Sequence, residues 1–202
     1  MAQNHLDKLD ADIASAQKLV TKVPLHECRT ELQGLSLQSF IFLTHAAIEF
    51  YFETLGAYAA SSAVRRYKDE GIITKSLVGL VSCKILDDIG DKGRKRIASD
   101  VAASIGTFAS EALSLYIRKT QSNNGIRKDN LNNLLIPVGV EPEIEDVGAF
   151  NALDVFGSHR GDIAHQFSAI RTEHTLSSVT TTLGTIRLGI ATYDAAVDAA
   201  LR

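Results

Sequence analysis

The chain has 202 residues, of which 45% are apolar and 22% are charged, a composition ordinary for one globular domain with a buried core. The formal net charge is −3, so the chain lacks the overall positive charge by which proteins hold nucleic acid through bulk electrostatics. Any role with nucleic acid therefore needs a local site or a local cationic patch.

The two cysteines, Cys28 and Cys83, belong to no CxxC motif and to no Cys/His cluster, so neither a zinc site nor any other cofactor is expected. The first twenty residues are amphipathic and lack the apolar segment of a signal peptide. No run of about 18 apolar residues predicts a membrane span. We therefore expect a reduced, cytoplasmic protein without a membrane partner.

The first half of the chain predicts two main helices. Apolar residues at roughly helical spacing indicate a helix over residues 5–22, which Pro24 ends. Residues 37–67 show the strongest helical pattern, with Ser36 or Ser39 as the expected cap and Gly71 after the last turn. The apolar face of this second helix is Leu37, Phe40, Ile41, Thr44, Ile48, Tyr51, Phe52 and Leu55.

The second half predicts further helices, and no hairpin or alternating pattern indicates strands. The expected helices cover residues 74–87, 95–119, 149–167 and 173–201, and a short one lies near 128–135 within a polar insert at about 120–149. The sequence thus predicts an all-α fold, an antiparallel helical bundle of four to five main helices. Residues 1–202 are expected to form one domain.

The segment "FGSHRGDIAHQF" places Arg160 five positions before His165. On a helix these residues lie about 140° apart around the axis and roughly 7.5 Å apart along it. Histidine titrates near neutral pH and can move protons, while a guanidinium can neutralise the charge that develops on a phosphoryl group. The spacing alone is also compatible with a surface arginine and a partly buried structural histidine.

Three segments resemble the HEPN superfamily in the order in which that superfamily has them. "HRGDIAH" is similar to the RNxIAH form of its Arg-polar-x3-His signature. The "HAAIE" part of the helix "FIFLTHAAIEFYFETL" is similar to its second helix. The run "NNGIRKDNLNNLLIPVGV" resembles a loop of the RiboL-PSP branch. The resemblance covers about residues 37–200.

This resemblance implies a metal-independent endoribonuclease that works as a homodimer in a toxin, defence or stress role, with a possible antitoxin as partner. The composite site would face its own copy across a two-fold axis. Arg160 would hold the scissile phosphate of an RNA, and His165 would move the proton. The family has a polar residue directly after the arginine, where this chain has Gly161; Asp162 and His159 are the neighbouring candidates for a supporting role.

His45 and Glu49 lie four residues apart on the long helix, on a flank that also carries Glu53. The resemblance implies that Glu49 supports the site, whereas an ordinary exposed helix pair is the simpler interpretation. Only two potential metal ligands are evident, so no metal site is expected here.

A different hypothesis is a non-catalytic helical dimer that binds RNA or a partner protein. Gly161 and the negative net charge favour that alternative. The cationic residues that could form a local patch stand at helix ends, where the helix dipole also favours them: Arg65, Arg66, Lys68, Arg94, Lys95, Arg96, Arg118, Lys119, Arg127 and Lys128.

Overall fold

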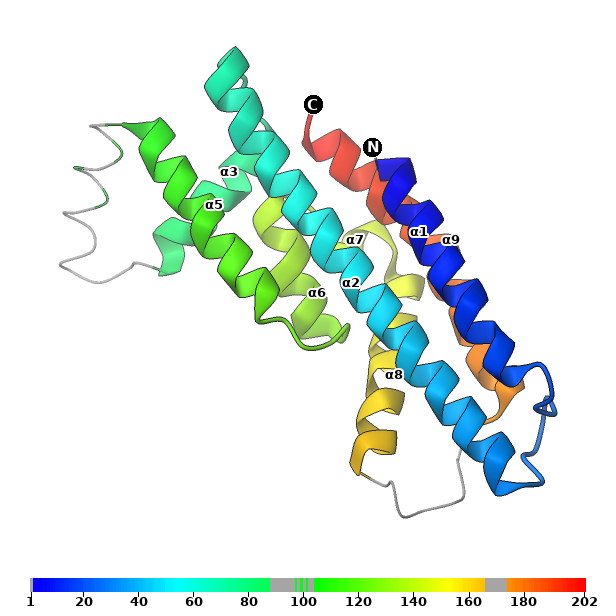
Figure 1. The fold of residues 1–202 in the computed structure, drawn as a ribbon. Coiled ribbons are helices and arrows are strands. Elements are labelled where there is room, and N and C mark those ends of the chain that lie inside the picture. Colours follow the sequence, from blue (N-terminus) through cyan, green and yellow to red (C-terminus); the bar gives the residue numbers. More distant parts are fainter. Residues whose placement is uncertain (1, 88–96, 98, 100, 102–103, 166–173) are drawn as a thin grey trace.

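The computed structural model describes residues 2–87, 97, 99, 101, 104–165 and 174–202. Helices dominate this part of the chain and no strand occurs within it, which confirms the predicted all-α bundle. Figure 1 shows one long helix, α2, running through the whole molecule, with the other helices on both sides of it.

Helix α2 spans Glu31–Glu70 and forms the centre of the core. Its predicted apolar face is fully buried, which confirms the helical periodicity. The expected cap at Ser36 or Ser39 was wrong, because the Thr30 hydroxyl accepts a hydrogen bond from the Gln33 N–H at 3.3 Å and the helix begins earlier. It ends at Gly71, whose φ of 71° is the left-handed conformation that glycine adopts without strain.

Two helices flank the first part of the bundle. Helix α1 spans Ala2–Gln17 and continues as a 3₁₀ turn over Lys18–Val20, in agreement with the first predicted helix. Helix α9 spans Leu176–Ala200 and runs in the same direction as α2 (Figure 1). The Tyr51 hydroxyl of α2 donates to the carboxylate of Asp194 at 2.5 Å, and Arg187 of α9 binds Asp10 of α1 at 2.5 and 2.6 Å. These bonds tie the three helices together.

The opposite half of α2 is covered by α3 (Lys75–Asp87), α5 (Ile105–Gln121) and α6 (Lys128–Leu135). The short helix expected near 128–135 is confirmed, whereas most of the predicted helix 95–119 before residue 104 lies outside the described residues. α5 packs closely on α2 at Gly56, where a Cβ would come within 2.2 Å of the Tyr116 oxygen. That hydroxyl donates to the Leu134 carbonyl at 2.6 Å and so fixes α6 as well.

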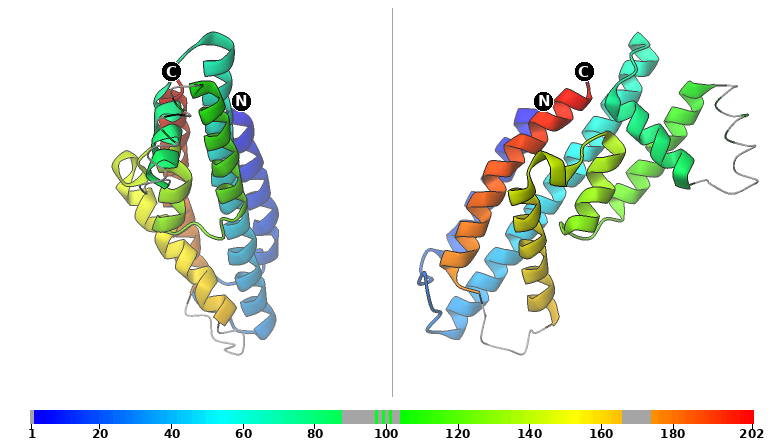
Figure 2. Two further views of the ribbon diagram at one scale, coloured as in Figure 1. Left: turned by 90° about the vertical axis from the view of Figure 1, so that its left-hand side faces the viewer. Right: turned by 180° about the vertical axis from the view of Figure 1, so that it is seen from behind.

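Helix α8 spans Val147–His165 and pairs with α9, following a 3₁₀ turn (Ile136–Val138) and the short α7 (Pro142–Glu145). Figure 2 shows α8 beside both α2 and α9. The pair approaches closely at Gly189, where a Cβ would lie 2.1 Å from the Cβ of Ala149. In the described ranges, none of the helices is both long enough and apolar enough to cross a membrane.

Candidate active site

The middle of α2 turns an imidazole and a carboxyl group towards α8. His45 is 2% exposed and its Nδ1 lies 3.6 Å from Oε2 of Glu49, whose side chain is 17% exposed. The sequence had placed His45 on a polar flank, but the structure buries it in the contact between α2 and its neighbours. A titratable group taken out of water in this way favours its neutral form.

Arg160 of α8 is half-buried, and its positive charge acts on both of these residues. Burial, and then the charge of Arg160, lower the pKa of His45 from 6.5 to about 4, so this imidazole is neutral at neutral pH. Burial and the charge of Glu53 raise the pKa of Glu49, while Arg160 and the N–H of Gly125 act in the opposite direction. The cation of Arg160 thus lies in the same electrostatic environment as a neutral imidazole and a carboxyl group.

The loop between α5 and α6 contributes a further polar side chain, which contacts the carboxyl groups of α2. The amide nitrogen of Asn123 donates to Oε1 of Glu53 at 3.0 Å and is 3.4 Å from Oε1 of Glu49. We call His45, Glu49, Glu53, Asn123 and Arg160 the polar cluster. It combines one cation, two carboxyl groups and two neutral polar side chains that come from three separate elements.

The other predicted site residues stand around Arg160 on α8. The backbones of Asp162 and His165 belong to α8, which is described as far as His165, and their side chains lie outside the described part. The ring of His159 packs edge-on against Phe156 and lies 3.8 Å from the ring centre of His174. The structure therefore places His159 in an aromatic contact with the residue that precedes the N-cap of α9.

The position directly after Arg160 is open. Among the described residues, no atom outside the nearby backbone of α8 lies within 4 Å of a Cβ built on Gly161, and the residue has an ordinary helical conformation. The described part of the chain therefore leaves room for a side chain at this position.

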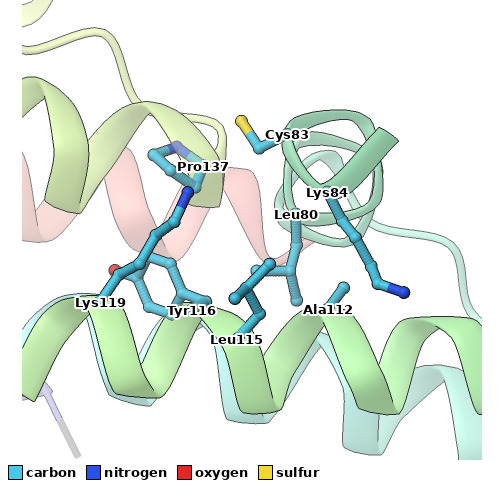
Figure 3. A pocket seen from close by; sticks show the side chains of 8 residues that line it. All are labelled: Leu80, Cys83, Lys84, Ala112, Leu115, Tyr116, Lys119 and Pro137. Atoms are coloured by element: carbon cyan, nitrogen blue, oxygen red, sulfur yellow. The ribbon is translucent and has the colours of Figure 1, made fainter. Parts of the chain in front are cut away.

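Metal binding has no structural support in the part of the chain that is described, where no group of three or more His, Cys, Asp or Glu side chains is placed to hold an ion. A surface pocket lies elsewhere, between α3 and α5 beside Pro137, and Figure 3 shows the side chains that line it. Its buried Lys84 binds Glu111 at 2.8 Å and lies over the ring of Phe108, which stabilises the α3–α5 contact. None of the predicted site residues lines this pocket.

Asn123 was missed at the level of sequence, although its segment was noted. "NNGIR" has the composition of a turn, and its two asparagines carry no mark of which one reaches another helix. The partners of Asn123 lie 70 and 74 positions earlier in the chain, so no local pattern could reveal them. The likeness of this run to a family loop was the one available signal.

The profile of the RiboL-PSP-HEPN family matches residues 4–186, nearly the whole chain. The chain belongs to this family, which confirms the family that the sequence had suggested. No curated protein and no solved structure gives a significant match.

Proposed function

We propose that this HEPN protein is a metal-independent endoribonuclease with a composite arginine–histidine site at a homodimer interface. The observation that carries the proposal is the position of Arg160. Its charge acts on His45 and Glu49 of α2, and His165 follows it five residues later on the same helix. A half-buried guanidinium, in a member of this family, is suited to hold a phosphate group.

The proposed chemistry uses the 2′-hydroxyl of the RNA as nucleophile. As this oxygen attacks the phosphorus, the bond to the 5′-oxygen breaks, which leaves a cyclic phosphate and a free 5′-hydroxyl. His165 takes the proton of the 2′-hydroxyl, and the corresponding histidine of a second copy returns a proton to the leaving oxygen. Arg160 neutralises the charge that develops on the non-bridging oxygens.

A second copy has an apolar surface of α2 to pack on. Leu32, Leu43 and Phe50 are 73%, 54% and 48% exposed, and their spacing places them on one side of the helix. Glu53 follows Phe50 by three residues and lies about 60° from it around the helix, so a copy that covers this side comes close to that member of the polar cluster. Exposed apolar surface of this kind is typical of protein–protein contacts.

A non-catalytic dimer that binds RNA or a partner protein is the second candidate. Gly161 favours it, because the polar group that the family has directly after the arginine is missing in this chain. A toxin, defence or stress role, an antitoxin partner and a cytoplasmic location belong to the proposal for the active enzyme.

Cleavage of labelled RNA in the presence of a chelator tests the proposal. We expect the wild type to cut, and Arg160→Ala and His165→Ala to lose at least about a hundredfold in rate. Arg29→Ala and His26→Ala, which alter exposed residues of the loop before α2, are the matched controls and should cut as the wild type does. Inactive wild-type protein of confirmed dimeric mass would support the binding alternative, and activity that the chelator abolishes would contradict the mechanism.

A further inference from the structure

In the loop before α6, hydrogen bonds determine which end of each of two successive side-chain amides is the nitrogen and which is the oxygen. The backbone N–H of Arg127 can only donate, and it lies 3.2 Å from Oδ1 of Asn130. The nitrogen of Asn130 must therefore point the other way, and it donates to Oδ1 of Asn123 at 3.0 Å. This leaves the nitrogen of Asn123 directed at the carboxyl groups of Glu49 and Glu53. The backbone N–H of Arg127 thus determines which group donates and which accepts in each hydrogen bond of this series.

The same loop is anchored to α8 at Asp154, nearly two turns before Arg160. The guanidinium of Arg127 binds Asp154 at 3.1 Å, and the N–H of Lys128 donates to the same carboxylate oxygen at 3.3 Å. The loop can approach α8 only because Gly157 has no side chain: a Cβ there would lie 2.8 Å from Cγ of Arg127. The loop is therefore in contact with α2 through Asn123 and with α8 through Arg127.

Asn123 makes hydrogen bonds beyond its own turn, unlike a residue that only stabilises a turn. The two hydrogens of its amide have three acceptors: the carbonyl of Gly125 and Oε1 of Glu53, both at 3.0 Å, and Oε1 of Glu49 at 3.4 Å. The bond to Glu53 is therefore the direct one across to α2, and the longer contact to Glu49 shares its donor. Those carboxyl groups stand one turn apart and repel each other when both are ionised. A neutral donor between them lowers that repulsion and restricts their rotamers.

We propose that Asn123 is a positioning residue of the site: it holds Glu49 in a fixed place on α2 while its loop holds the segment of α8 that carries Arg160. The effect on cleavage rests on the function proposed above. The effect on Glu49 does not, because it follows from the hydrogen bonds alone. The two parts of the inference can therefore fail separately.

The experiment compares Asn123→Ala and Asn123→Asp with the wild type. Asn124→Ala and Asn124→Asp are the matched controls, because Asn124 is the exposed neighbour in the same loop. The pKa of Glu49 is measured by carbon NMR on protein with labelled glutamate side chains, and its signal is assigned with Glu49→Gln. Cleavage of RNA is measured in parallel as kcat and KM, and folding as a thermal transition.

We expect Asn123→Ala to raise the pKa of Glu49 by a few tenths of a pH unit, since its 3.4 Å contact to the carboxylate is lost while the N–H of Gly125 still acts on that group. The third carboxylate of Asn123→Asp should raise it further. In Asn123→Ala, kcat should fall about tenfold while KM stays within about twofold, because positioning acts on the transition state. Both Asn124 variants should match the wild type.

An unchanged pKa of Glu49 in Asn123→Ala would overturn the inference, as would a change in KM alone. A variant that no longer folds would show that Asn123 serves the fold and would overturn it as well. If the wild type cuts no RNA, the proposed function fails, and the pKa of Glu49 still decides whether Asn123 positions it.

Discussion

The buried His45 makes a testable contribution to the pH dependence of stability. The substitution is His45→Gln, which keeps a polar side chain opposite Glu49 but does not titrate. In the unfolded chain the pKa of His45 is about 6.5, and in the folded protein burial and Arg160 lower it to about 4. Below pH 6.5 the unfolded state therefore binds a proton that the folded state does not bind, so stability falls as the pH falls.

The magnitude follows from the difference between these two pKa values. Each pH unit between them costs about 1.4 kcal/mol, and the whole interval costs about 3 kcal/mol. Between pH 7 and pH 5 the loss is about 2 kcal/mol, a large part of the total stability of an ordinary domain. Above pH 6.5 neither state is protonated at His45, and the stabilising effect of the neutral form is fully present.

Urea unfolding of both proteins at several pH values between 7 and 5 measures this effect. The wild type should lose about 2 kcal/mol relative to His45→Gln, which corresponds to a shift of roughly 1 M in the urea midpoint. Subtracting the variant removes the contribution of the groups that titrate alike in both proteins. A difference that stays constant across this pH range would refute the reasoning, because His45 would then titrate equally in both states.

Two glycine positions give further predictions. Gly189→Ala should destabilise the protein by about 2 kcal/mol, since its Cβ would overlap Ala149. Gly184→Ala on the same helix has open space among the described residues and should raise the melting temperature by about 2–4 °C. Equal effects of the two variants in a thermal melt would contradict the close approach of α8 and α9 at Gly189. Gly161→Asn restores a polar group after the arginine at a position with room for it and should raise kcat/KM for RNA about fivefold, with Gly161→Ala as the control for helix propensity; an activity no higher than that of the alanine variant would show that a polar group there is not what the site needs.

The sequence predicted the helices of this protein well, because their signals are local. The residues of the predicted apolar face of α2 recur every three or four positions, and all of that face is buried as the periodicity requires. The start of α2 was placed too late, since several residues can cap a helix and only the geometry shows that Thr30 does. Several neighbouring residues can give the sequence signal of a helix cap, so the sequence predicts helix ends less accurately than apolar helix faces.

The polar cluster was predictable only in part. Arg160 and Glu49 stood out through the family resemblance. The burial of His45 did not, because it depends on α8 covering that side of α2, and a helix carries no local mark of what will lie against it. The role of the Asn123 loop depends on contacts with residues 70 and 74 positions away. Such long-range contacts are a property of the tertiary fold.

The unbroken course of α2 restricts which changes in chain length the protein can accept. A helix of 40 residues is about 60 Å long, and each residue added or removed turns everything beyond it by about 100°. One inserted residue between the buried Phe40 and Glu49 would turn this carboxyl group away from α8 while the first turns stayed in place. Insertions and deletions between these positions should therefore be excluded by the geometry of the site, while substitutions on the exposed side of the same turns remain acceptable.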